Sequence, residues 1–254
     1  MLAVFAWLGI GWALFIAVDI LGMVELGTPL YPHLFNDRAI EWTQWVLLAL
    51  AIAASAYLAG RLQAEDRAGS ARFFFLLAIG LGLMLIEDAG DVRHTISGYA
   101  WGMVGYEIFG LHHAVVTHVP YYAALAAVPV YAVLRYGRYP WASVRTRLYL
   151  GGGVLLYALA AMASALAFLD DLYVEVGAWV DRVVLAGRLP VPDGIAASGA
   201  HYMLVDSVLE ESVELLAAGM MLAAILAFAS YVRSSHVDRA TRPDDRASET
   251  PPSP

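Results

Sequence analysis

Residues 72–95 read RFFFLLAIGLGLMLIEDAGDVRHT, an apolar run that ends abruptly in Glu87, Asp88, Asp91 and His94. A run of about 20 apolar residues rises 1.5 Å per residue and crosses the roughly 30 Å hydrocarbon core of a bilayer. Carboxylates at membrane depth are costly and usually serve ion, proton or substrate chemistry. The stretch therefore predicts a transmembrane helix with a functional site near one end.

The composition extends this prediction to the whole chain. Hydrophobic residues make up 60% of the sequence and charged residues 15%, far from the balance of a soluble domain. We predict an all-α bundle of about six transmembrane helices in one domain, residues 1–235, followed by a disordered polar tail, residues 236–254. The expected spans are 2–24, 43–62, 72–92, 116–134, 148–169 and 202–232.

Arginine placement predicts the orientation. Eleven of the 15 basic residues fall within 61–72, 135–147 and 233–246, and the other four fall in the alternate loops. By the positive-inside tendency, both termini are then cytoplasmic, in a multi-pass protein of the cell membrane. Most acids lie on the outer side, so the site is expected to face the extracytoplasmic side, and nucleic acid is not an expected partner. The expected partner is the lipid bilayer.

The outer loops are the longer ones and contain one further expected element. Residues 172–186, LYVEVGAWVDRVVLA, have a moderately amphipathic pattern. This pattern predicts a helix that lies on the membrane interface.

Two residue types are missing, and their absence excludes several chemistries. The sequence contains no cysteine and no lysine. Disulfides, thiolate metal ligands and cysteine nucleophiles are therefore excluded, as are a Schiff base and a phosphate-binding loop lysine.

The acids form two stripes if each helix is continuous. At 100° per residue, Asp91 lies about 40° and His94 about −20° from Glu87. In the last span, Glu210 and Glu214 follow Asp206 in the same way, at about 40° and 80°.

The stripes are also expected at similar depth. We take the inner arginines, or Met1 for the first span, as one plane at the cytoplasmic surface. The height above this plane is roughly 26–28 Å for Asp19, Asp91, His118 and Glu214. Glu87 lies about a turn deeper, and His94 and Glu210 about a turn higher. Polar groups from four helices are thus expected at one level.

This residue set points first to a metal site. Carboxylate oxygens with imidazole nitrogens bind Zn²⁺, Mn²⁺ and non-haem iron, and the spacing of Asp91 and His94 is that of the half-motif used in di-iron bundles. The predicted ligands of this divalent metal are Asp91, His94, His118, Glu210 and Glu214. Glu87 is the candidate general base and Asp19 a second candidate catalytic acid.

Simpler explanations exist for each group. The acids after residue 86 can mark a helix end emerging into water, and those of 206–214 can complement a helix dipole. Asp19 can pair with a tyrosine or histidine neighbour, and His118 can serve a local structural role before Pro120.

Three functional classes remain open. The preferred one is a metal-dependent enzyme acting on a lipid or other apolar substrate, with an acid-only enzyme as a variant of it. The second is a cation- or proton-coupled transporter or channel, against which the apolar inner half of every span argues. The third is a non-catalytic assembly or sensor subunit.

Overall fold

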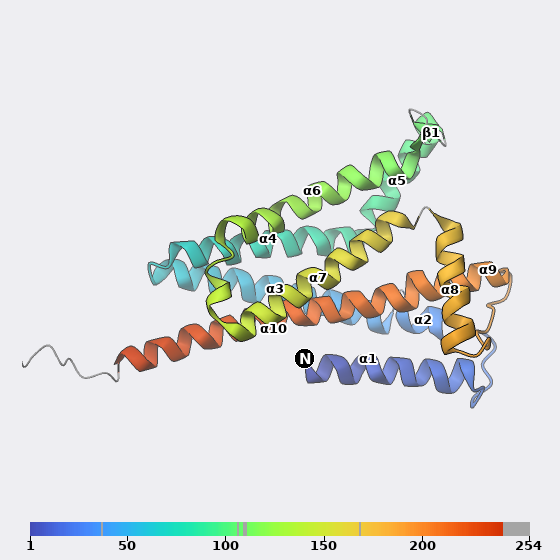
Figure 1. The fold of residues 1–254 in the computed structure, drawn as a ribbon, viewed down its shortest axis with the longest axis horizontal. Helices are drawn as coiled ribbons and strands as arrows, with labels where there is room; N and C mark the ends of the chain where they lie inside the picture. Colours follow the sequence, from blue (N-terminus) through green and yellow to red (C-terminus); the bar gives the residue numbers. More distant parts are fainter. Residues whose placement is uncertain (37, 106, 109–110, 168, 241–254) are drawn as a thin grey trace, which may run out of the picture.

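The computed structural model describes residues 1–36, 38–105, 107–108, 111–167 and 169–240. Within these residues, six helical stretches are long and apolar enough to cross a membrane, which confirms the predicted all-α multi-pass architecture. They lie roughly along one direction (Figure 1), and residues 241–254 of the predicted tail fall outside the described part.

The first half of the chain supplies three spans. The first consists of α1 (Leu2–Phe15) and a π-helical turn, η1 (Ile16–Ile20), and the second of the short α2 (Tyr31–Phe35) and α3 (Ala39–Ala64). The third span is α4 (Ala68–Gly90). It is followed by α5 (Val92–Val104) and then by a hairpin of two short strands, β1 (Glu107–Ile108) and β2 (Leu111–His112).

The second half supplies the other three. The fourth span is α6 (His113–Tyr136), and the fifth is α7 (Val144–Leu166), which follows the 3₁₀ turn η2 (Pro140–Ala142). The last span consists of α9 (Ala197–Met203), the π-helical segment η3 (Leu204–Glu210) and α10 (Glu211–Ala240). Between α7 and α9, α8 (Asp170–Val184) crosses one end of the bundle (Figure 1). The helix expected at 172–186 is confirmed, whereas its place on a membrane interface stays a prediction.

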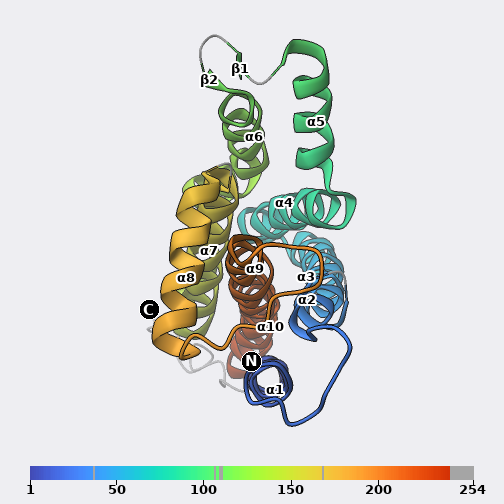
Figure 2. The same cartoon turned by 90° about the vertical axis from the view of Figure 1, so that its right-hand side faces the viewer.

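The last span occupies the centre of the bundle. In the end-on view of Figure 2, α10 lies between α7, α3 and α1, and α4 packs beside α3. The main apolar core joins α3, α4, α7 and α10, where the rings of Phe74 and Phe228 lie 4.9 Å apart. A second core joins α1, α2 and η3 around Phe15, Tyr31 and Phe35. This packing fixes α4 and α10 side by side with α3.

The helix α6 is attached differently from the others. It packs closely on α4 but has few contacts with α7. A Cβ on Gly80 of α4 would lie 3.1 Å from the Pro129 ring, so the absence of a side chain allows this close approach. Pro120 and Pro129 both stand inside α6, and each removes a backbone hydrogen-bond donor.

One sequence prediction is wrong at the end of α4. The helix was expected to continue through residue 92, but Asp91 has φ 46° and ψ 41°, a left-handed conformation that ends α4 and starts α5. Aspartate is among the few residues that adopt this conformation readily. Glu87 and His94 therefore belong to different helices, and the expected stripe through both does not form.

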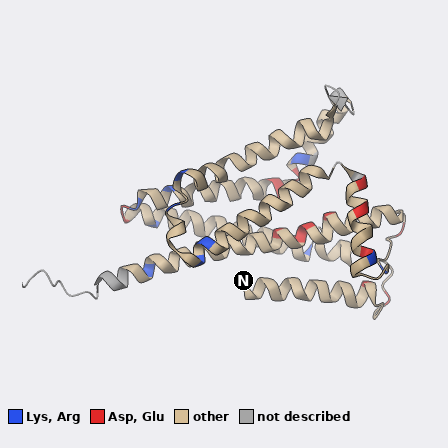
Figure 3. Cartoon of the chain, viewed as in Figure 1, with Lys and Arg blue, Asp and Glu red and all other residues tan. Residues whose placement is uncertain are grey.

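The charged side chains separate along the bundle. Figure 3 shows most arginines at one end and most acids at the other. This separation agrees with the two groups of loops distinguished in the sequence. Which end faces the cytoplasm stays a prediction.

Candidate functional site

A cavity of about 620 Å³ lies among α3, α4, α6, α7 and the last span. Its volume is within the roughly 300–1,000 Å³ of typical small-molecule pockets. The carboxyl side chains that line it come from three helical spans: Glu41, Glu87, Asp88, Asp91, Asp206, Glu210, Glu211 and Glu214. The rest of the wall is largely apolar and includes Leu77, Leu81, Met84, Leu125, Val133, Leu150 and Met221. The cavity therefore has an acidic end and an apolar end.

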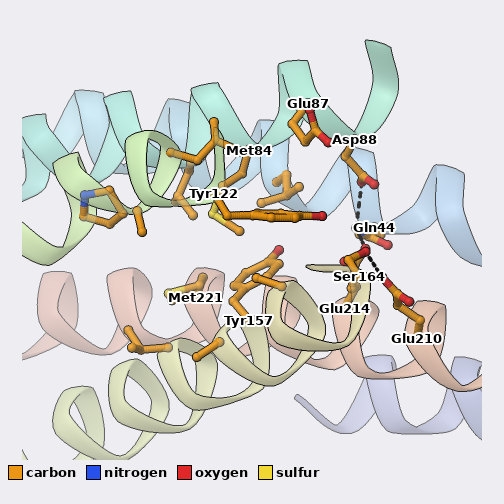
Figure 4. A pocket seen from close by; sticks show the side chains of 18 of the residues that line it. Gln44, Met84, Glu87, Asp88, Tyr122, Tyr157, Ser164, Glu210, Glu214 and Met221 are labelled. Atoms are coloured by element: carbon orange, nitrogen blue, oxygen red, sulfur yellow. Dashed lines mark hydrogen bonds between the residues drawn. The ribbon is translucent and has the colours of Figure 1, made fainter. Parts of the chain in front are cut away.

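Gln44 of α3 joins the two acidic helices. Its Nε2 donates to Asp88 Oδ2 of α4 at 2.7 Å and to Glu214 Oε2 of α10 at 2.8 Å. Trp45 Nε1 donates to the same Asp88 oxygen at 2.8 Å. Gln44 is 1% exposed, whereas Asp88 and Glu214 are partly buried where they line the cavity. Figure 4 shows the acids of α4 and α10 converging here from opposite sides.

Glu87 has a different environment because it contacts the arginine that follows the break. Arg93 donates its backbone N–H to Glu87 Oε2 at 3.2 Å, and Arg93 Nε lies 3.8 Å from Glu87 Oε1. Tyr121 also donates a hydrogen bond to Glu87. Arg93 Nη1 donates to Tyr122 Oη at 2.8 Å and to the Ser164 carbonyl at 2.9 Å. The guanidinium thus links α5, α6 and α7 at the acidic end.

Glu210, at the end of the π-helical segment η3, forms a third environment. It accepts hydrogen bonds from the Ser164 hydroxyl of α7 and, at 3.3 Å, from Tyr173 of α8. Burial, followed by the charges of Glu210 and Asp206, raises the pKa of Tyr173 above its usual value. The tyrosine is therefore a hydrogen-bond donor at ordinary pH. π-Helical turns often occur at functional sites, and this one carries two of the lining acids.

Three buried side-chain oxygens on the cavity wall have no hydrogen-bond partner among the described residues. These are Gln44 Oε1, the Tyr157 hydroxyl and Glu211 Oε2. Tyr157 projects into the cavity from α7 (Figure 4). Buried polar groups are nearly always paired, so each of these needs a partner from solvent or a ligand.

The cavity has an opening between α6 and α7, which we call the lateral mouth. Ala126, Val130 and Leu134 of α6 and Val154 and Ala158 of α7 line the cavity and are also exposed on the surface of the chain. Their four-residue spacing places each set along one face of its helix. Both helices are long and apolar enough to cross a membrane.

The structure brings only some of the predicted site residues together. Glu87, Asp91, Glu210 and Glu214 line this cavity. His118 lines a second cavity of about 310 Å³ instead, with His112 and His113. The His94 side chain lies outside the described part.

Asp19 lies apart from both cavities. Its two carboxylate oxygens accept the backbone N–H groups of Leu30 and Tyr31, each at 2.7 Å, at the start of α2. These contacts fit the structural alternative for Asp19, with backbone donors in place of a tyrosine or histidine side chain, and its catalytic role stays a prediction.

The residues described by the structure contain no group of three or more histidine, aspartate or glutamate side chains placed to hold a metal ion. The predicted ligand His118 is in a different cavity from Asp91, Glu210 and Glu214. Only three of the five predicted ligands are thus seen around one space.

Sequence reasoning missed the groups that hold the acids in place. A continuous helix places Arg93 opposite Glu87, whereas the break at Asp91 turns it toward the same site. Gln44 was detectable in principle, since it is a polar side chain within the expected span 43–62. Tyr157 and Ser164 also lie in an expected span, 148–169, but nothing in the sequence relates them to the acids.

Comparison with protein-family models, with characterised proteins and with solved structures finds no match to this chain.

Proposed function

We propose that this protein is a membrane enzyme that carries out acid–base chemistry on an apolar or amphiphilic substrate held in the cavity. The observation that carries the proposal is the Gln44 bridge, which brings Asp88 and Glu214 together at the acidic end of an otherwise apolar cavity. A carboxyl pair beside an apolar binding space provides a proton donor next to a substrate that has left water.

The different environments of the acids suggest different roles. Glu87 contacts the Arg93 guanidinium, so we assign it the role of proton acceptor. Asp88 and Glu214 instead each accept from the same neutral amide, and two nearby carboxyl groups without a direct cation favour keeping a proton on one of them. We assign this pair the role of proton donor. In an isomerisation, the pair gives a proton to one substrate atom and Glu87 removes a proton from another, so the substrate mass is unchanged.

The same cavity argues against a conducting pathway. A transported cation would need polar groups along the inner half, but Leu77, Val133 and Leu150 line the cavity there. An enzyme or binding protein for an apolar molecule is better supported by this wall.

The chemistry also depends on whether the acids of the cavity bind a metal ion. Asp91, Glu210 and Glu214 line one cavity and are oxygen donors suited to iron, zinc or manganese. Elemental mass spectrometry of untagged protein, purified without chelators, answers the question directly. Stoichiometric metal in the wild type that is lost in Asp91→Asn and Glu214→Gln establishes a metalloenzyme, whereas protein that stays metal-free after incubation with these ions leaves the acids to act alone.

Proton transfer itself is tested in heavy water. The purified protein is reconstituted with a lipid extract of its source membranes in D₂O, and the lipids are analysed by mass spectrometry for deuterium at carbon and for new products. We expect a labelled or altered lipid with the wild type and none with Asp88→Asn or Glu214→Gln.

The matched control is Glu175→Gln, which removes an exposed acid of α8 that does not line the cavity. This variant should retain the wild-type labelling. If folded wild-type protein changes no lipid in the extract, the enzymatic proposal is wrong and the cavity is that of a non-catalytic binding or sensor subunit.

A further inference from the structure

The charge inside the cavity is strongly one-sided. Among the described lining residues there are eight carboxyl side chains and one cationic side chain, Arg93. Even where neighbouring acids share protons, such a wall attracts a positive ligand group and repels an anionic one. Arg93 shows that a cation fits against this wall, since its guanidinium lies 5.6 Å from the centre of the Tyr122 ring.

The buried groups without partners point in the same direction. Gln44 Oε1 is a hydrogen-bond acceptor, and Glu211 Oε2 belongs to a carboxyl group that is 8% exposed. Two buried acceptors on one cavity wall require a donor that the described residues do not supply. An ammonium group carries three donors and a positive charge, so one ligand group can satisfy both acceptors and offset the acids.

The route into the cavity is apolar. The lateral mouth is bordered by Ala126, Val130 and Leu134 on one side and by Val154 and Ala158 on the other. A molecule that passes it from the bilayer meets hydrocarbon side chains first and reaches the acids only deeper inside. A ligand with a long apolar chain suits this path and the apolar end of the cavity.

We propose that the ligand is a membrane-dissolved, single-chain amphiphile whose head is a protonated amine, and that it enters between α6 and α7. This inference rests on the proposed function, because it names the substrate class of the same cavity. The ammonium head lies between Gln44 Oε1 and Glu211, and the chain occupies the space between α6, α7 and α10.

The test compares three ligands of equal chain length. Wild-type protein in nanodiscs of zwitterionic lipid is titrated with radiolabelled hexadecylamine, and hexadecanol and hexadecanoic acid are used as competitors. We expect saturable amine binding, with the alcohol competing at least about 10-fold more weakly because it lacks the charge and two of the donors. The acid should not compete.

The variants identify the position of the head group. Glu211→Gln and, as a second probe, Asp206→Asn should each weaken amine binding by about 10-fold, while the exposed control Glu175→Gln leaves it unchanged. Folding of each variant is checked by its thermal transition. Equal binding of alcohol and amine, or unchanged amine binding by folded Glu211→Gln and Asp206→Asn, overturns the inference.

The two proposals fail separately. Amine binding without deuterium transfer to any lipid overturns the enzymatic function and keeps the ligand class. Deuterium transfer to neutral lipids by a protein that does not bind hexadecylamine overturns the ligand class and keeps the enzymatic function.

Discussion

Asp19 and the Asp88–Glu214 pair look alike in the sequence but occupy opposite kinds of environment. All three acids lie in apolar helices, and Asp19 and Glu214 were expected at a similar depth. Both oxygens of Asp19 accept backbone N–H groups at 2.7 Å, so this carboxylate holds the start of α2 in place. Asp88 and Glu214 accept from one side-chain amide and border a cavity with unpartnered polar groups. The comparison teaches that the donors around a buried acid, more than its depth, separate a structural role from a chemical one.

The largest expected effect comes from removing the acid pair. Asp88→Asn or Glu214→Gln should reduce lipid turnover by at least about 100-fold, because a positioned general acid contributes about 10²–10⁴-fold. Turnover is measured by mass spectrometry at matched protein concentration. The thermal transition should change little, since the side-chain amide of either variant still fits beside Gln44. A variant that unfolds while its residual folded fraction stays active would show that the pair has a structural role like that of Asp19.

Asp19 should give the reverse result. Asp19→Asn replaces one acceptor oxygen with an NH₂ group that faces a backbone N–H, and the loss of a charge-assisted hydrogen bond costs about 1.5–3 kcal/mol. Chemical denaturation in detergent should detect this loss, while turnover per folded molecule stays at the wild-type value. A stable but inactive Asp19→Asn protein would instead support the catalytic role predicted from the sequence.

A substitution at the lateral mouth sharpens the comparison by testing access alone. Ala158→Trp places an indole between α6 and α7 and should slow amine uptake by about 10-fold, since narrowing a gate affects the rate of access. Leu155→Trp is the matched control, because Leu155 is 60% exposed on the same helix and does not line the cavity. Stopped-flow fluorescence with a dansylated long-chain amine measures both rates, and equal slowing by the two substitutions would contradict the lateral route.

The smallest expected effect concerns Ser164. Ser164→Ala removes one hydrogen bond to Glu210, while Tyr173 still donates to the same carboxyl group. A net loss of about 1 kcal/mol corresponds to roughly fivefold lower turnover. A loss as large as that of Asp88→Asn, measured in the same assay, would mean that Glu210 and not the Gln44 bridge holds the critical proton.

The span pattern was predictable because it depends on length and hydrophobicity alone. Six apolar stretches were expected and six candidate spans are found, with ends that move by several residues. The first ends at Ile20, the fourth begins at His113, and α10 continues to Ala240, four residues beyond the expected start of the tail at 236. Such shifts are ordinary, since helix ends depend on local caps and packing.

The site was less predictable because it depends on where helices stop being regular. The angular estimate treats residues 87–94 as one helix, and a single left-handed residue, Asp91, invalidates it. The π-helical turn η3 changes the angles of Asp206 and Glu210 in the same way. The partners Gln44 and Arg93 come from other helices, and no spacing rule within one helix identifies them.

The two prolines inside α6 are the points at which this helix bends most easily. Each leaves a carbonyl without its usual helical donor, and α6 is held mainly on the α4 side, where the Pro129 ring rests on Gly80. This contact fixes one point of α6 against α4, whereas few contacts join α6 to α7. Bending of α6 at the prolines would widen the gap toward α7 and leave the Gln44 bridge between α3, α4 and α10 in place, but it would also shift Tyr121 and Tyr122, which contact Glu87 and Arg93.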